Sequence, residues 1–131
     1  MPAYSLTVLP GHYSVCLLPP LASIPPWANG GDFCSITRTS DELSIICAQA
    51  LLPSELPEGS TLARDWNLLR VEGPFAFDVT GVLAALSAPL AQADVVVLAV
   101  ATYQTDYLLV KAEQVERVTT ALIEAGHRIN T

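Results

Sequence analysis

The sequence VVVLAVATYQTDYLLVK, from Val95 to Lys111, consists of two apolar runs separated by a short polar segment. Apolar runs of this length are typical of strands, so the sequence predicts a β-hairpin whose first strand is buried on both faces or nearly so. Short hairpin turns usually contain Gly or Asn. Here the turn region instead carries Thr102, Thr105 and Asp106. These side chains indicate a role beyond the turn itself.

The sequence on either side of this hairpin predicts one helix before it and one after it. Apolar residues recur on one helical face of segment 77–94, where Asp78 or Thr80 is a natural N-cap. Pro89 falls late in this helix and is expected to kink or shorten its last turn. The second helix is expected over 113–126, where Gly126 ends it.

Short strands are expected outside these helices, at 66–73 and at 127–130. The second half of the chain then has the order βαββαβ, which is the ferredoxin-like motif. We therefore predict an α+β fold with antiparallel sheets and helices on one face.

The first half of the chain resembles the second. When the chain is shifted by 64 positions, residues 41–51 (DELSIICAQAL) lie over residues 105–115 (TDYLLVKAEQV). Upstream, a short helical turn is expected near Trp27, and a Pro-rich loop replaces the second helix. The pattern predicts a tandem duplication. Its expected units are a degenerate one over residues 1–64 and a complete one over residues 65–131.

Composition excludes several classes of protein. With 51% hydrophobic residues, 15% charged residues and a mean hydropathy of +0.42, the chain is too apolar to be disordered. Its longest apolar run is too short to span a bilayer. The net charge is −7 and the six Lys and Arg are scattered, which argues against nucleic-acid binding. So apolar a composition suggests that a second copy covers part of the surface, as in a homodimer.

The cysteines bear on compartment and cofactors. Cys16, Cys34 and Cys47 lie in apolar, strand-like segments without the spacing of metal ligands. We expect reduced core thiols in a cytoplasmic protein without a metal or other cofactor, and a reactive thiol is the alternative. No basic segment precedes an apolar one at the amino terminus, so a secretory signal is not expected.

The sequence does not predict an enzyme. Asp78 and Asp106 are the one pair considered for general acid–base chemistry. His12 and His127 have no nucleophile motif beside them, and no glycine-rich phosphate loop is present. We therefore expect no catalytic residues.

Three stretches resemble a known family: RTSDELSIIC at 38–47, VEGPFAFDVTG at 71–81 and ATYQTDYLLVK at 101–111. They are similar to the ACT-domain proteins, in particular to a small bacterial tandem-ACT group resembling the arginine sensor CASTOR and the regulatory domains of aspartokinase. The resemblance implies two tandem ACT units, the first degenerate. It also implies a regulatory or sensing function, with a free amino acid bound at a seam between ACT units.

The resemblance further implies which residues contact that ligand. They belong to the loop and helix start after the first strand of one unit, and to the strand and turn of the paired unit: Phe77, Asp78, Val79, Thr80, Gly81, Leu98, Thr102, Tyr103, Thr105 and Asp106.

The residues themselves allow a functional and a structural reading. A helix start offers N–H groups for a carboxylate, Gly81 lets a ligand approach the backbone, and Asp106 with the threonine hydroxyls suits an ammonium group. Alternatively, Asp78 and Thr80 only cap the helix, and Gly81 serves close packing. Asp106 with Thr105 would then form an Asx-type turn, and Tyr103 would be an ordinary strand aromatic.

These observations lead to one preferred function and one alternative. The preferred function is a non-catalytic, amino-acid-binding regulatory or sensor protein that acts on a protein partner. The alternative is a structural or interaction module that dimerises through its sheets without a ligand.

Overall fold

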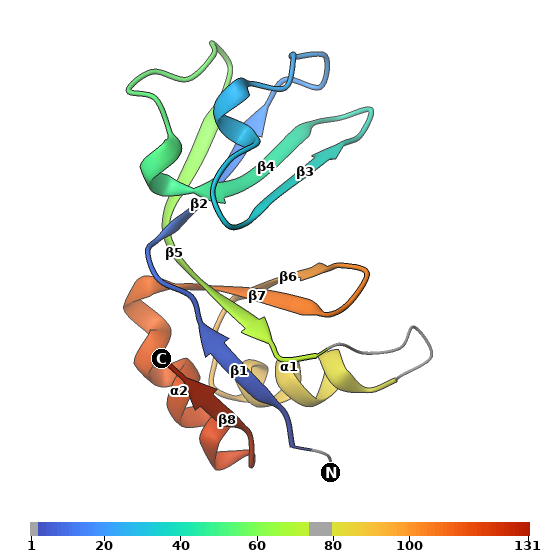
Figure 1. Ribbon diagram of the computed structural model, residues 1–131, viewed down its shortest axis with the longest axis vertical. Coiled ribbons are helices and arrows are strands. Elements are labelled where there is room, and N and C mark those ends of the chain that lie inside the picture. The colour runs from blue at the N-terminus through green and yellow to red at the C-terminus, as the bar shows by residue number, and fades with distance from the viewer. Residues whose placement is uncertain (1–2, 74–79) are drawn as a thin grey trace. The chain divides into compact units, whose positions relative to one another are not determined.

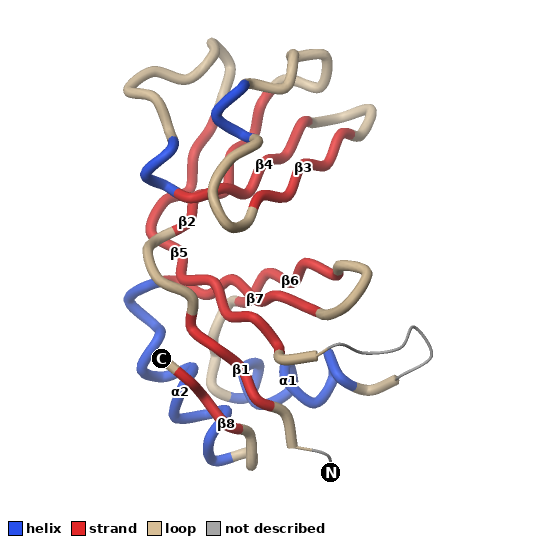
Figure 2. The backbone as a smooth tube through the Cα atoms, in the orientation of Figure 1, coloured by secondary structure: helices blue, strands red, loops and turns tan. Residues whose placement is uncertain are grey.

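The computed structural model describes residues 3–73 and 80–131 (Figures 1 and 2). Its strands and helices follow in the order β1 (Ser5–Val8), β2 (Tyr13–Leu18), η1 (Pro26–Ala28), β3 (Cys34–Arg38), β4 (Leu43–Ala48), η2 (Gln49–Leu51), β5 (Thr61–Val71), α1 (Val82–Gln92), β6 (Val97–Ala101), β7 (Asp106–Lys111), η3 (Ala112–Gln114), α2 (Val115–Glu124) and β8 (Arg128–Asn130). The elements η1, η2 and η3 are single-turn 3₁₀ helices. No helix among the described residues is long and apolar enough to cross a membrane.

The chain divides into two compact units, and the division falls within β5. The amino-terminal unit is Gly11–Trp66, and the carboxy-terminal unit contains β1 together with Asn67–Thr131. Sequence analysis set the boundary after residue 64 and assigned β1 to the first unit. In the structure β1 pairs with β5 and β8, so it belongs to the sheet of the second.

The amino-terminal unit is a sheet in the order β3–β4–β2–β5 with almost no helix. The single turn near Trp27 is present as η1, and η2 stands where a second helix would follow β4. Both are too short to cover a sheet face. Their place is taken by loops, and the core is built mainly from strand residues: Cys16, Leu18, Ala28, Leu43, Ile45 and Cys47. The first unit is therefore degenerate in its helices and complete in its strands.

The carboxy-terminal unit has the expected order βαββαβ, from β5 to β8. Its sheet runs β6–β7–β5–β1–β8, with β1 antiparallel to β5 and parallel to β8. The helices α1 and α2 contribute Leu86, Leu90, Val118 and Leu122 to a core shared with Leu69, Val71, Leu108 and Val110 of the strands. The predicted α+β fold is confirmed.

His127 ties β1 to the rest of the carboxy-terminal unit. The backbone N–H of Tyr4 donates to its Nδ1 at 3.1 Å, and its Nε2 lies 3.2 Å from the carbonyl oxygen of Ala85 in α1. Since Nδ1 accepts a hydrogen bond, Nε2 carries the proton and donates to that carbonyl. This buried imidazole therefore satisfies two backbone groups from segments far apart in the sequence.

One expectation about this unit was wrong. The strand β6 is not buried on both faces: Val96 just before it is 58% exposed, and Ala99 and Ala101 are exposed. The reason is its place at the edge of the sheet, where it pairs with β7 alone among the described strands. Pro89 lies inside α1, and the helix does not end at the proline but continues to Gln92.

The two units repeat with an offset of 63 positions, one fewer than the sequence comparison gave. The elements β6, β7 and η3 begin at residues 97, 106 and 112, against 34, 43 and 49 for β3, β4 and η2. The hairpin turns correspond in detail. Thr39 N–H donates to Glu42 O at 2.9 Å, and Thr102 N–H donates to Thr105 O at 2.8 Å. Each threonine Oγ1 also accepts the N–H of the residue three positions later.

Candidate functional site

The turn between β6 and β7 is held by its own threonines. Thr102 Oγ1 donates to the carbonyl oxygen of Thr105 at 2.9 Å and accepts its N–H at 3.3 Å. Thr105 Oγ1 donates to the carbonyl oxygen of Val71 at 2.5 Å. The predicted Asx-type turn of Asp106 with Thr105 is therefore wrong, since Thr102 closes the turn. The Thr105 bond also fastens this turn to the end of β5.

Asp106 takes no part in closing this turn. It is the first residue of β7, opposite Ala101, and it is half-buried. Side chains alternate along a strand, so Asp106 shares a face with Leu108 and Val110, which lie in the core against the helices. Its carboxylate makes no hydrogen bond or ion pair with any described residue. Asp106 is thus a charged side chain on the helix-covered side of the sheet.

The repeat shows what packing alone places at this position. With the offset of 63, Asp106 corresponds to Leu43, the first residue of β4. Leu43 is 0% exposed and lies in the core of the amino-terminal unit. The offset of 64 positions predicted from the sequence aligns Glu42 with Asp106, so it hides the difference between Leu43 and Asp106. The same strand position holds a core leucine in one unit and a carboxylate in the other.

No described residue caps the start of α1 with its side chain. Its N-cap residue is Gly81, with φ +83°, and Thr80 before it is exposed. Capping by Thr80 was therefore wrong, because the cap position belongs to a residue without a side chain. Close packing is also the wrong reason for Gly81, since a Cβ there would meet nothing within 4 Å. The left-handed backbone requires the glycine, and it leaves the first N–H groups of α1 without a side-chain acceptor at the cap.

The remaining residues predicted to contact the ligand differ in location and in exposure. Figure 1 shows the β6–β7 turn and the start of α1 at the same edge of the carboxy-terminal unit. Leu98 is half-buried in β6, whereas Tyr103 at the turn is 78% exposed. The predicted contacts Phe77, Asp78 and Val79 lie outside the described residues.

A polar cluster that sequence analysis missed lies beside the end of β5. Thr7 Oγ1 donates to Glu72 Oε1 at 2.6 Å, and Arg70 Nε donates to the same oxygen at 3.0 Å. These two hydrogen bonds, Thr7 first, lower the pKa of Glu72 below its ordinary value. No sequence signal could have found the cluster, because it depends on the pairing of β1 with β5.

A second polar cluster lies in the amino-terminal unit. Ser14 Oγ donates to Gln49 Oε1 at 2.8 Å, Gln49 Nε2 donates to Asp65 Oδ1 at 2.9 Å, and His12 Nδ1 lies 3.7 Å from the same Asp65 oxygen. The residue types are those of a nucleophile triad, yet the buried Ser14 hydroxyl is directed at an amide and not at the imidazole. Asp65 has φ +65° where β5 shifts register against β2. The cluster therefore braces a β-bulge.

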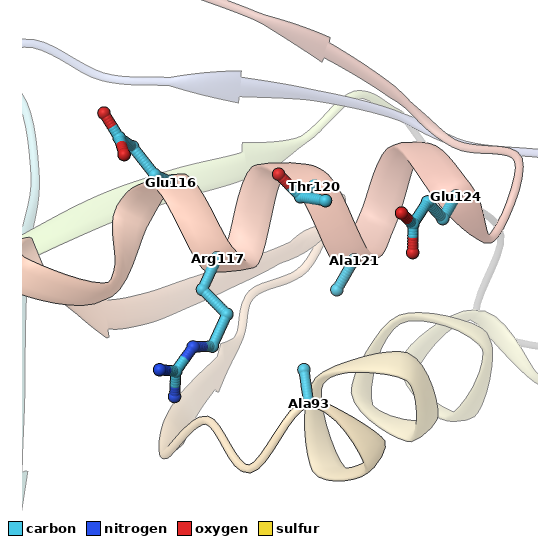
Figure 3. A pocket seen from close by; sticks show the side chains of 6 residues that line it. All are labelled: Ala93, Glu116, Arg117, Thr120, Ala121 and Glu124. Carbon is cyan, nitrogen blue, oxygen red and sulfur yellow. The ribbon is translucent and has the colours of Figure 1, made fainter.

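Surface grooves lie along α2, away from the β6–β7 turn. One of about 430 Å³ is lined by Ala93, Glu116, Arg117, Thr120, Ala121 and Glu124 (Figure 3). Its charged residues are Glu116, Arg117 and Glu124, and Figure 3 shows the Glu116 carboxylate directed away from the Arg117 guanidinium. Glu124 stands two helical turns from Arg117, roughly 10 Å along the axis. The charges of one α-amino acid are much closer together. This groove is therefore a weaker candidate than the region of Asp106.

Comparison with known families identifies this fold. A family model described as the ACT domain matches residues 61–124, which span β5 to α2 and the candidate site. The chain belongs to the ACT-domain family. A further model, described as an N-terminal domain, matches residues 11–55 of this ACT protein.

Named relatives of this ACT protein are sensors. The cytosolic arginine sensor for mTORC1 subunit 1 of Rattus norvegicus is 28% identical over 90% of the chain, and its Homo sapiens counterpart is 29% identical over 74%. The chain covers only 37% of the rat protein and 31% of the human one. It therefore spans about a third of the length of the curated relatives it matches.

Solved structures agree on the fold of this ACT protein. A crystal structure of a protein from Agobacterium tumefaciens is 36% identical, with a TM-score of 0.89 over 98% of this chain and 93% of that one. The regulatory subunit of aspartate kinase from Thermus flavus has a TM-score of 0.65 at 13% identity, over 92% and 95% of the two chains. The second likeness is one of fold alone.

Proposed function

We propose that this protein is a non-catalytic regulatory module that binds a free amino acid at its carboxy-terminal ACT unit. Asp106 takes the α-ammonium group, and the first N–H groups of α1 take the α-carboxylate. Thr102 and Thr105 hold the turn in place, and Leu98 and Tyr103 border the site together with Phe77, Asp78, Val79 and Thr80. A second ACT unit completes the site at a seam, in a cytoplasmic homodimer.

One observation carries this proposal: Asp106 replaces a core leucine of the repeat. Removing a carboxylate from water without a partner is unfavourable. A chain selected only for packing would keep an apolar residue here, as the other unit does with Leu43. A bound ammonium group would supply a partner that no described residue provides, and it would explain a carboxylate at a position where packing favours leucine.

Two further features support the proposal. The start of α1, which no described side chain caps, provides donors for an anion at the same edge of the unit as the β6–β7 turn, and a Cβ at Gly81 would meet nothing within 4 Å. The named relatives are arginine sensors, which makes arginine the first ligand to test. A ligand that favours one arrangement of ACT units would then change what a protein partner recognises.

A second candidate function rests on the edge strand β6. Its outer edge is unpaired among the described strands, and its sequence VLAVA carries no charge. Such an edge is suited to pairing with another chain. Under this alternative the protein is an interaction module that dimerises without a ligand.

A thermal-shift screen against the common amino acids tests the proposal. An amino acid present at about 100 times its dissociation constant adds about 2.7 kcal/mol to the free energy of unfolding. We expect one or two amino acids, arginine among those tested, to raise the melting temperature. A screen in which none does so leaves the interaction module as the function.

The variant Asp106→Leu tests the contrast between Asp106 and Leu43, because it places at position 106 the residue that the amino-terminal unit has at the matching position. Loss of a charged hydrogen bond costs roughly 1.5–3 kcal/mol, so calorimetry should show binding weakened about tenfold to a hundredfold. The free energy of unfolding without ligand should be equal or higher. Unchanged affinity in a folded variant contradicts the role of Asp106.

A further inference from the structure

The three cysteines, far apart in the sequence, lie on three neighbouring strands of the amino-terminal unit. Cys34 is in β3, Cys47 in β4 and Cys16 in β2, and the sheet order is β3–β4–β2. All three are free thiols. Cys16 and Cys47 are buried, whereas Cys34 is half-buried and so the most accessible of the three.

Cys34 and Cys47 lie directly opposite each other. The turn fixes the type of this pair, because Thr39 N–H donates to Glu42 O and makes these two residues a hydrogen-bonded pair. The types alternate along an antiparallel ladder, so the pair of Cys34 with Cys47, five steps further, is not hydrogen-bonded. In such pairs the Cα atoms are about 4.5 Å apart, which lies within the range that a disulfide spans.

Cys16 and Cys47 have a different relation. Cys16 lies opposite Ile45, and Cys47 lies opposite Ser14, so the two thiols are diagonal neighbours. Diagonal Cα atoms are about 7–8 Å apart, beyond the reach of an unstrained disulfide. Their thiols instead hydrogen-bond to each other, which lowers the pKa of Cys16 and raises that of Cys47.

The repeat shows that the fold does not need a thiol at either position. With the offset of 63, Cys34 and Cys47 correspond to Val97 and Val110, which also lie opposite each other. Val110 fills the core of its unit as Cys47 fills that of the other. A valine pair therefore satisfies the same register, and the cysteine pair has a chemistry that packing does not require.

We propose that Cys34 and Cys47 form a dithiol that a peroxide oxidises reversibly to a cross-strand disulfide. The sulfur of Cys34 attacks one peroxide oxygen, the O–O bond breaks, and Cys34 becomes a sulfenic acid as one water leaves. The sulfur of Cys47 then attacks the sulfur of Cys34, the S–O bond breaks, and a second water leaves. Two electrons pass from the thiols to the peroxide, and both thiol protons end in water.

Peptide mapping of the oxidised protein tests this pairing. The reduced full chain is treated with hydrogen peroxide, its remaining thiols are alkylated, and its peptides are identified by mass spectrometry. We expect a peptide pair joined through Cys34 and Cys47, an alkylated Cys16, and full recovery of all three thiols with a dithiol reductant. The Cys16→Val variant should form the same link.

Matched controls come from the repeat and from the unfolded chain. The double variant Cys34→Val with Cys47→Val should fold and form no link, whereas oxidation in urea should give mixed links, because only the folded ladder selects one pair. Three outcomes overturn the proposal: no disulfide forms, Cys34 goes on to the sulfinic acid without a link, or the link joins Cys16 or a second chain.

Discussion

The two hairpins, β3–β4 and β6–β7, have the same backbone and different contents. Both begin and end at positions 63 apart, and both close with a threonine that bonds three residues ahead. Inside this common frame the first unit has Leu43 and the pair of Cys34 with Cys47. The second has Asp106 and a valine pair. Differences at matched positions are therefore choices of side chain that the backbone does not impose.

The same comparison separates what folds a unit from what a unit does. The amino-terminal unit lacks both long helices, yet its strands keep the ferredoxin-like order. The carboxy-terminal unit keeps both α1 and α2. The start of a long helix and a carboxylate at the first position of the second hairpin strand occur together in one unit, whereas the other unit has Leu43 at that position and only single-turn helices. This pairing is what a binding site for a zwitterion requires.

Transferring the carboxylate to the other unit should have the largest effect. Leu43→Asp places a charge at a wholly buried position with no partner, and we expect it to lower the free energy of unfolding by more than about 4 kcal/mol. Urea denaturation measures the loss, and hydrogen exchange should show it first in β3 and β4.

The truncation Leu43→Ala is the control for lost packing. It should cost roughly 2–5 kcal/mol and less than Leu43→Asp in the same experiment. If the aspartate variant is as stable as the alanine variant, position 43 tolerates a charge. The contrast between Leu43 and Asp106 then carries no functional meaning.

Sequence analysis predicted much of the second unit, because its signals are local. The helical periodicity around Leu86 and Leu122, the apolar run of β7 and the cap at Gly126 each depend on nearby residues. The degenerate first unit was also predicted, since Pro53 and Pro57 fall where a second helix would follow β4.

The errors arose where distant segments meet. The place of β1 depends on pairing with β5 and β8, which no local pattern encodes. The offset was misjudged by one because Glu42 and Asp106 are both acidic, although only Thr39 and Thr102 build the turns. The cap of α1 was assigned to the nearest polar side chains, while the backbone at Gly81 has a positive φ. The bond from Thr105 to Val71 also joins segments far apart in the sequence, so no local pattern could predict it.

Equal losses of unfolding free energy from matched variants of the two turns would show that the threonine hydroxyls stabilise both hairpins alike. Thr39→Val and Thr102→Val each keep the β-branched shape and remove the hydroxyl that bonds the residue three positions ahead. Each hydroxyl makes two hydrogen bonds, and one such bond contributes about 1 kcal/mol, so each variant should lose roughly 1–2 kcal/mol in urea denaturation. A loss confined to one turn would mean that the two hairpins are stabilised differently despite their matching geometry.

The smallest effect concerns Glu72, whose hydrogen bonds with Thr7 and Arg70 have no counterpart in the first unit. Its folded pKa lies below the ordinary value of 4.5, so its contribution to stability is fully present above that pH. The contribution is lost as pH falls toward the folded pKa, because the unfolded chain then binds the proton first. Glu72→Gln should therefore melt slightly below the parent at pH 7, and the difference should vanish at a pH low enough to protonate Glu72 in the folded chain. The control is Glu58→Gln, at an exposed residue of the first unit, which should melt like the parent at both values. If the difference in melting temperature between Glu72→Gln and the parent persists at low pH, it arises from the changed side chain and not from the charge of Glu72.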